Sequence, residues 1–262
     1  MITVNGLKIN IDSYPDGTIL MKQQITFGPR ADIGWTFEND REFLALIYTV
    51  KHLRRNGFSP INLYMPYIPN ARMDRVKSDG DVFTLKYFAE VLNDLKLDSV
   101  TVLDPHSSVS EALIDNLTVI TPNNYIYAVL HKIPTEDDNL LIFYPDEGSM
   151  KRYSGVLNRP YVFGIKKRDW KTGKIEGLDV IGEVDQITGK DILIIDDICS
   201  RGGTFLHSAK KLKELGANDI YLYVSHCENT ILEGELLEGD LIKRVYTTNS
   251  IFTKEHEKIE VL

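Results

Sequence analysis

Apolar positions in the first half of the chain follow helical and strand periods in turn. From Glu38 to Arg55 apolar residues recur at helical spacing, with Gly57 as a C-terminal stop, and Phe83–Leu95 has the same spacing. The apolar runs 61–69 and Ser99–Asp104 lie on either side of the second helix and are predicted to be strands. This alternation predicts a mainly parallel sheet flanked by helices.

The same alternation begins again after residue 120. Helices are predicted at Pro122–Ile133, Ser149–Leu157 and Thr204–Leu215, and strands at "NLLIFY", "YVFGIKKRD", Asp191–Ile195 and "DIYLYVSH". The N-terminal segment Ile2–Gln24 alternates apolar and polar residues around "YPDG", which predicts extended structure folded at a turn. We therefore expect an α/β protein with two lobes, residues 1–125 and 126–262, whose last residues are candidates for packing back on the first lobe.

Composition narrows the class of protein. The chain has 262 residues, of which 43% are hydrophobic and 26% charged, and a net charge of -8. This charge argues against a broad nucleic-acid or membrane surface but leaves room for a local basic pocket. The sequence shows no signal segment and no apolar run long enough to span a bilayer, so a cytoplasmic protein is expected. Cys199 and Cys227 are too few for a zinc site or a disulfide framework, and we expect reduced, packed thiols.

The segment "ILIIDDICSRGGTF" carries the most specific chemistry. A predicted strand runs into Asp196 and Asp197, and ligands of open parallel sheets bind at the carboxyl ends of strands. Gly202 and Gly203 allow backbone amides to approach a ligand, and Thr204 opens a helix whose first amides attract an anion. A phosphate in the loop and sugar hydroxyls on the aspartates predict a receptor for a ribose 5-phosphate unit. The alternative is an acidic turn capped by Thr204.

This segment resembles the phosphoribosyl diphosphate (PRPP) loop shared by type I phosphoribosyltransferases and PRPP synthetases. Further segments resemble PRPP synthetase motifs in the same order along the chain: "SYPDGT", "YMPYIPNARMDRV", "VLDPHS", "YPDEGSMKR", "KKR" and "YTTNSI". The chain is therefore similar to the ribose-phosphate diphosphokinase (PRPP synthetase) family, shortened at both ends. This resemblance implies a fold of two phosphoribosyltransferase-like lobes.

The resemblance also implies a role for each matched residue. It implies catalysis by Lys166 and Arg168, ATP binding by Tyr14, Asp16, Arg72, Asp74 and Arg75, magnesium binding by His106 and Asp146, and ribose-phosphate binding by Asp196, Asp197, Cys199, Ser200, Arg201, Gly202, Gly203 and Thr204. Each single residue has a plainer alternative, such as a helix cap for Asp146 or a solvated strand face for the catalytic pair. Their shared order favours the functional interpretation.

The implied reaction transfers the diphosphate of Mg-ATP to the anomeric hydroxyl of ribose 5-phosphate and gives PRPP and AMP. The family loop matched by Tyr14 and Asp16 reaches a neighbouring subunit, so a homo-oligomer is expected. Ser200 and Arg201 stand where the family usually has Asp and Thr, which makes the loop about two charge units more positive. A larger acceptor such as ADP-ribose is therefore one alternative. A type I phosphoribosyltransferase and a non-catalytic regulatory homologue are the others.

Overall fold

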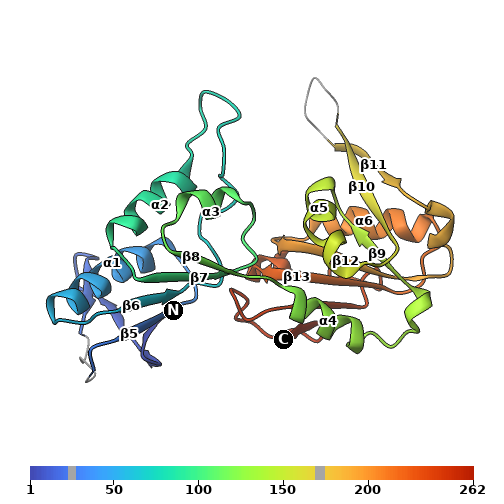
Figure 1. Cartoon of the computed structure of the whole chain (residues 1–262). Helices are drawn as coiled ribbons and strands as arrows, with labels where there is room; N and C mark the ends of the chain where they lie inside the picture. Colours follow the sequence, from blue (N-terminus) through green and yellow to red (C-terminus); the bar gives the residue numbers. More distant parts are fainter. Residues whose placement is uncertain (23–27, 169–174) are drawn as a thin grey trace. The chain divides into compact units, whose positions relative to one another are not determined.

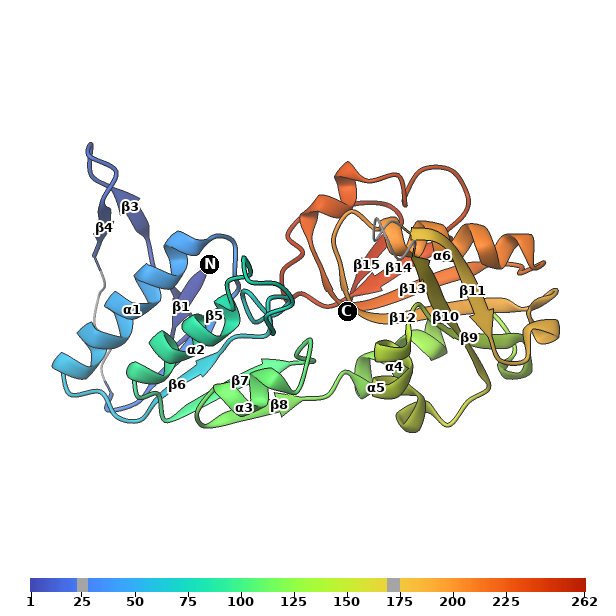
Figure 2. The same ribbon diagram turned by 90° about the horizontal axis from the view of Figure 1, so that it is seen from above.

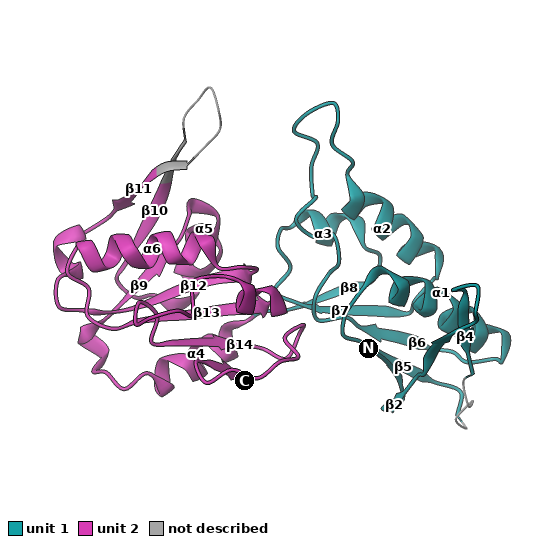
Figure 3. Cartoon of the chain, turned by 180° about the vertical axis from the view of Figure 1, so that it is seen from behind, with its two compact units in different colours: residues 1–121 teal, residues 122–262 magenta. Residues whose placement is uncertain are grey.

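The chain divides into two compact units, Met1–Thr121 and Pro122–Leu262, each with its own sheet (Figure 3). The computed structural model describes residues 1–22, 28–168 and 175–262, and the side chains of these residues except 166–168 and 175–176. The sequence placed the division after residue 125, inside a helix. The structure keeps that helix whole, as the first element of the second unit.

The first unit is built on a mainly parallel sheet. In chain order its elements are β1 (Ile2–Val4), β2 (Leu7–Lys8), β3 (Ile11–Ser13), β4 (Ile19–Met21), β5 (Ala31–Trp35), α1 (Asp40–Arg55), β6 (Ile61–Tyr64), α2 (Thr84–Asp94), β7 (Ser99–Leu103), α3 (Val109–Leu113) and β8 (Leu117–Ile120). The described sheet order is β2-β1-β5-β6-β7-β8, in which β5 to β8 are parallel and β1 is antiparallel to both neighbours.

Helices α1 and α2 pack on the same face of this sheet (Figure 1). Leu46 of α1 and Phe88 of α2 belong to one buried cluster with Leu63 of β6, as helical spacing and strand alternation require. Between the inward-facing residues of β6, Asn62 and Tyr64 are less buried and turn to the opposite face.

The predicted N-terminal turn is a two-stranded hairpin, β3 and β4, which projects from the first unit (Figure 2). The amide of Tyr14 donates to the carbonyl of Thr18 at 2.9 Å, and Gly17 has a φ of 85°. Glycine adopts this conformation at little cost, so "PDG" closes the hairpin as the sequence predicts.

The second unit has a longer sheet. Its elements are α4 (Asn123–Lys132), η1 (Asp137–Asn139), β9 (Leu140–Tyr144), α5 (Glu147–Leu157), β10 (Tyr161–Arg168), β11 (Ile175–Ile181), η2 (Val184–Ile187), β12 (Asp191–Cys199), α6 (Gly203–Glu214), β13 (Ile220–Cys227), η3 (Asn229–Glu233), β14 (Arg244–Thr247) and β15 (Ile259–Val261). The described order is β11-β10-β9-β12-β13-β14-β15, with β10 and β11 antiparallel and the other pairs parallel.

Helices cover both faces of the second sheet. Phe205 and Leu212 of α6 pack in one buried cluster, whereas Val129 of α4 and Tyr153 of α5 pack in the other. Burial on both faces explains why Ile192–Ile195 is continuously apolar. The predicted α/β fold, with mainly parallel sheets flanked by helices, is confirmed.

One detail of the second sheet differs from the sequence-based expectation. Strand β12 does not end at Ile195 but continues to Cys199, because it still pairs with β13, where Cys199 lies opposite Cys227. The last residues form β15 beside β14 in the second sheet, and their packing on the first lobe stays a prediction.

Candidate functional site

Three carboxylates gather at the carboxyl ends of two neighbouring parallel strands. Strand β9 lies beside β12, and Asp146 follows β9 where Asp196 and Asp197 continue β12. The Asp197 amide donates to Asp196 Oδ1 at 3.0 Å. Burial, with the charges of Asp197 and Asp146, raises the pKa of Asp196 well above its usual value. This edge is therefore a place where hydroxyl donors or a cation would be stabilised.

Asp146 also begins helix α5. Its Oδ1 accepts a hydrogen bond from the Ser149 amide at 3.1 Å, and the Ser149 hydroxyl and the Asp146 backbone complete a capping box. The helix-cap interpretation of this residue is thus correct as a structural role. The same cap fixes the carboxylate at the sheet edge, so the two interpretations are compatible.

Arg152 belongs to this site although the sequence analysis assigned it no role. Its Nη1 lies 3.5 Å from Asp197 Oδ2, and its guanidinium lies 5.5 Å from the centre of the Tyr153 ring. The Asp197 side chain is only 6% exposed, so this cation is its compensating charge. Helical spacing was the sequence signal that could have indicated this position. Arg152 follows Ser149, a residue of the capping box, by three residues on α5, so the two lie on the same side of the helix.

The loop after β12 has the form expected of an anion site. Gly202, with a φ of 79°, is the N-cap of α6, which begins at Gly203. The first amides of a helix have no partner within the helix and carry a partial positive charge. Ser200 and Thr204 are half-buried beside these amides, and Cys199 is buried at the end of β12 as a free thiol, like Cys227. Amides at the start of a helix, preceded by a glycine turn, can bind a phosphate.

Arg201 does not stand alone in this loop. Its Nη2 lies 2.9 Å from Glu233 Oε2, with the two side chains 71% and 58% exposed. The carboxylate offsets one of the two positive units that the sequence comparison assigned to the loop. Glu233 is a second residue that the sequence analysis missed, since it lies 32 positions further along the chain.

In the first unit, three of the predicted residues lie together. The segment after β6 carries Asp74 and Arg75, and His106 follows the adjacent strand β7. Arg75 Nε lies 2.8 Å from Asp74 Oδ1. Burial opposes ionisation of Asp74, but hydrogen bonds from Arg75 and Ser107, with the charge of Arg75 and a smaller contribution from His106, outweigh it and lower the pKa of Asp74. Asp74 is thus a buried anchor for Arg75, and Arg72 lies exposed on the same segment.

Tyr14 and Asp16 lie on the β3–β4 hairpin. The Tyr14 side chain is half exposed. Asp16 Oδ1 accepts hydrogen bonds from the Thr18 amide at 3.0 Å and the Thr18 hydroxyl at 2.7 Å, and these lower the pKa of Asp16. Thr18 therefore holds the aspartate in the turn.

The catalytic pair lies at the margin of what the structure describes. Lys166 and Arg168 belong by their backbones to β10, where they pair with Leu178 and Ile175 of β11. Their side chains lie outside the described part of the chain. The assignment of Lys166 and Arg168 to catalysis therefore stays a prediction.

The described side chains do not include a group of three or more His, Cys, Asp or Glu residues arranged for a metal ion. Magnesium keeps several waters and commonly takes one or two protein carboxylates together with substrate phosphates. The carboxylate of Asp146, at an acidic edge beside the anion loop, is a suitable donor of this kind. His106 belongs to the first unit and Asp146 to the second.

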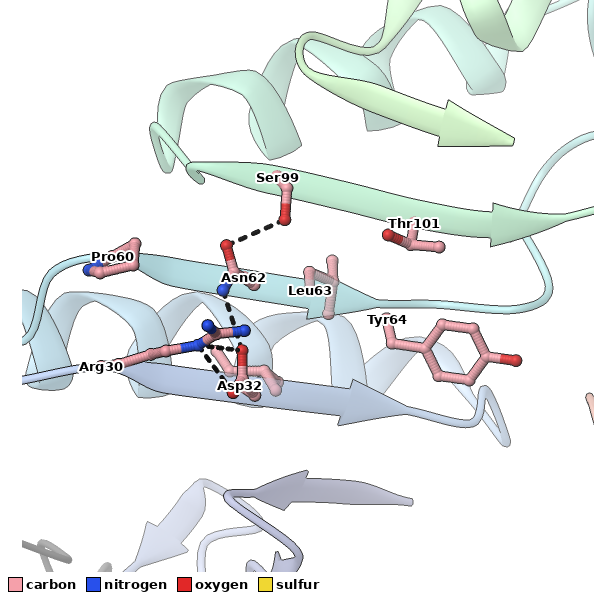
Figure 4. Close-up of a pocket in the computed structure, with 9 residues that line it drawn as sticks. Arg30, Asp32, Pro60, Asn62, Leu63, Tyr64, Ser99 and Thr101 are labelled. Atoms are coloured by element: carbon pink, nitrogen blue, oxygen red, sulfur yellow. Dashed lines mark hydrogen bonds and ion pairs between the residues drawn. The ribbon is translucent and has the colours of Figure 1, made fainter. Parts of the chain in front are cut away.

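A separate hollow of about 500 Å³ lies on the uncovered face of the first sheet (Figure 4). A polar row crosses its floor: Ser99 donates to Asn62 at 2.9 Å, and Asn62 donates to Asp32 at 2.8 Å. Arg30 closes the row by donating to Asp32 at 2.9 Å. The hollow contains no residue predicted for the site, and its polar groups bond to one another, so we assign no function to it.

Comparison with known proteins identifies the relatives of this chain. Residues 171–261 match the family model of the phosphoribosyl synthetase-associated domain. The ribose-phosphate pyrophosphokinase of Saccharolobus solfataricus is 26% identical over 274 residues, covering 100% of this chain and 90% of that protein. That of Bacillus caldolyticus is 29% identical over 264 residues, covering 97% and 81%.

A solved structure shares the fold. The phosphoribosylpyrophosphate synthetase from Mycobacterium smegmatis superposes with a TM-score of 0.80 at 17% identity, covering 97% of this chain and 85% of that one. The resemblance predicted from the ordered motifs is therefore confirmed along the chain. Among the described residues, no helix is both long and apolar enough to cross a membrane.

Proposed function

We propose that this chain, a relative of the ribose-phosphate pyrophosphokinases along its whole length, is an ATP-dependent diphosphotransferase. It transfers the diphosphate of ATP to the anomeric hydroxyl of ribose 5-phosphate and gives PRPP and AMP. The observation that carries the proposal is the edge formed by Asp196, Asp197 and the loop Cys199–Thr204. The carboxylates are hydrogen-bond acceptors that suit vicinal hydroxyls, and the first amides of α6 suit a phosphate, which supports the proposal.

The acceptor half of the reaction uses the second unit. The loop residues Ser200, Arg201, Gly202, Gly203 and Thr204 hold the 5-phosphate, and Asp196 and Asp197 accept hydrogen bonds from the ribose hydroxyls. Arg152 keeps Asp197 in place and limits repulsion between the carboxylates and the phosphate. Binding in this orientation leaves the anomeric hydroxyl as the attacking group.

The donor half uses the first unit. Arg72 and Arg75 bind the phosphates or adenine of ATP, and Asp74 orients Arg75 through its paired hydrogen bonds. Tyr14 and Asp16, on the projecting hairpin, contribute to a neighbouring subunit's adenine in a homo-oligomer. Lys166 and Arg168 stabilise the charge of the diphosphate in transfer.

Magnesium completes the proposal. Asp146 and His106 are each proposed as a magnesium ligand, and a bound magnesium ion would supply charge neutralisation for the ATP phosphates. A cytoplasmic location and a role in nucleotide biosynthesis follow from the same proposal.

The acceptor is tested by incubating the protein with Mg-ATP and either ribose 5-phosphate or ADP-ribose, and by measuring AMP and product mass. ADP-ribose is included because Arg201 adds positive charge to the loop, although Glu233 offsets part of it. AMP with ribose 5-phosphate is the expected result. AMP formed only with ADP-ribose would identify ADP-ribose as the acceptor. No AMP with either compound would refute the proposal that this chain is a diphosphotransferase.

Two further experiments separate the alternatives. ATP binding measured by calorimetry in the absence of PRPP is expected here and would not be expected of a phosphoribosyltransferase. Lys166→Ala should abolish AMP release while the circular dichroism spectrum is unchanged. A variant that releases AMP at a near-normal rate would exclude Lys166 from the catalytic pair.

A further inference from the structure

A short segment packs directly behind the anion loop. We call Asn229–Leu236, which comprises η3 and the three residues after it, the backing segment. It is tied to the end of β12 because the Glu228 amide, at its start, donates to the Cys199 carbonyl at 2.8 Å. The anion loop is therefore bounded on one side by a part of the chain that follows a different strand.

Gly234 makes the closest approach in this contact. A Cβ built at Gly234 would lie 1.9 Å from the carbonyl oxygen of Arg201 and 2.9 Å from its carbonyl carbon. Both atoms are backbone and cannot rotate away as the end of a side chain can. Any larger residue at 234 must therefore displace the loop or the backing segment.

Gly202 meets the same segment from the loop side. A Cβ at Gly202 would lie 2.7 Å from Leu236 Cδ2 and 2.8 Å from Leu236 Cβ. Leu236 is 1% exposed and belongs to the buried cluster under α6, so it is a fixed support rather than a mobile surface side chain. Gly202, whose positive φ turns the chain into α6, therefore packs directly against Leu236.

The third link is the ion pair between Arg201 and Glu233, at 2.9 Å. It draws the Arg201 side chain toward the backing segment while its carbonyl contacts Gly234. The residue with the most exposed charge in the loop is therefore held at both its backbone and its side chain.

We propose that the backing segment positions the anion loop, with Gly234 and Glu233 as positioning residues for the acceptor phosphate. The inference rests on the proposed function for its substrate, ribose 5-phosphate. The loop binds phosphate through backbone amides whose direction depends on the peptide planes at 200–204. Displacement of the Arg201 carbonyl turns one of those planes, so acceptor binding weakens while ATP binding, which uses the first unit, is unaffected.

The test compares Gly234→Ala with Gly155→Ala. Gly155 lies in helix α5, where a Cβ would meet no atom within 4 Å. We expect Gly234→Ala to raise the KM for ribose 5-phosphate about tenfold or more, because displacements near 1 Å have effects of this size. The KM for ATP should change by less than about twofold, and Gly155→Ala should leave both values unchanged. Equal changes in both KM values, or no change in either, would overturn the inference.

Glu233→Gln provides a variant without a steric change. It releases the Arg201 side chain, so it should raise the KM for ribose 5-phosphate about two- to fivefold although it also removes a negative charge near the loop. Glu235→Gln removes the same charge two positions away and should not raise this KM. If circular dichroism shows that Gly234→Ala does not fold, the comparison of Glu233→Gln with Glu235→Gln tests the positioning role instead. Equal effects of the two Gln variants would then overturn the inference.

A second readout separates this inference from the proposed function. Calorimetry with inorganic phosphate measures loop binding without turnover, so it applies even if the wild-type protein releases no AMP. We expect Gly234→Ala to bind phosphate about tenfold more weakly than wild type and Gly155→Ala to bind it equally. Phosphate binding that is absent in wild type, or equal in wild type and Gly234→Ala, would refute the positioning role.

Discussion

Arg152 is predicted to stabilise the second unit because it compensates a buried carboxylate. Arg152 Nη1 lies 3.5 Å from Asp197 Oδ2, and the two side chains are 26% and 6% exposed. At an effective dielectric constant near 20, two unit charges at that separation attract by about 5 kcal/mol. Desolvation of the partners offsets much of this attraction, so Arg152→Met should cost about 1–3 kcal/mol of unfolding free energy.

The assay is thermal unfolding, followed by circular dichroism. A loss of this size lowers the Tm by roughly 3–9 °C for a unit of this length. Met preserves most of the aliphatic contact of Arg152 with Tyr153, so the loss reflects the guanidinium, including its hydrogen bond to the Tyr153 hydroxyl at 3.2 Å.

Lys151→Met is the matched control. Lys151 precedes Arg152 on α5 and pairs with Glu147 at 2.8 Å, but both side chains are more than 60% exposed. An exposed pair of this kind contributes less than about 1 kcal/mol. If Arg152→Met loses no more stability than Lys151→Met, the account of charge compensation at the sheet edge is wrong.

Three other substitutions test separate features. Asp196→Asn should raise the Tm at pH 8, because burial and neighbouring carboxylates raise the pKa of Asp196 and make its ionised form costly. This gain in Tm should shrink as pH falls through the raised pKa. A lower Tm of the variant at pH 8 would contradict the reasoning. Gly164→Ala should cost about 1–3 kcal/mol, measured by urea unfolding, because a Cβ would lie 2.9 Å from the Pro145 carbonyl oxygen. Asp74→Asn should cost about 1.5–3 kcal/mol at neutral pH and raise the KM for ATP, because it weakens the hydrogen bonds to Arg75. Because the pKa of Asp74 is lowered in the folded state, ionised Asp74 stabilises the fold above the usual carboxyl pKa, and this stabilisation is lost as pH falls through the lowered pKa. If Asp74→Asn remained less stable than wild type below that lowered pKa, this reasoning would be contradicted.

Local patterns in the sequence predicted most of the elements. The helix predicted at Phe83–Leu95 is α2 at Thr84–Asp94, because apolar spacing on one face matches the buried cluster it joins. The turn at "YPDG" was equally clear, since Gly17 adopts the positive φ that the hairpin requires. These features depend on neighbouring residues, so they can be recognised without knowledge of the fold.

The end of β12 could not be found in this way. Two aspartates interrupt an apolar run, which suggests that the strand stops at Ile195. The strand continues because β13 offers partners as far as Cys227, opposite Cys199. Pairing between strands supplies backbone hydrogen bonds regardless of side-chain polarity, and it is not visible in a local pattern.

The candidate site shows the same limit. The loop and its aspartates were found from the sequence because strand, acids, glycines and helix follow one another directly. Arg152 and Glu233 were not found, because each acts on a residue that lies more than thirty positions away in the sequence. Such ion pairs depend on how the strands are ordered in the sheet, which composition and spacing do not specify.

The most direct test of the central claim is which phosphoryl group leaves ATP. Phosphorus NMR of the protein with Mg-ATP and ribose 5-phosphate should show AMP together with a new diphosphate attached to the anomeric carbon. Formation of ADP would mean transfer of a single phosphate, and an unchanged ATP spectrum would mean no transfer. Either result would contradict the assignment of this chain as a diphosphotransferase.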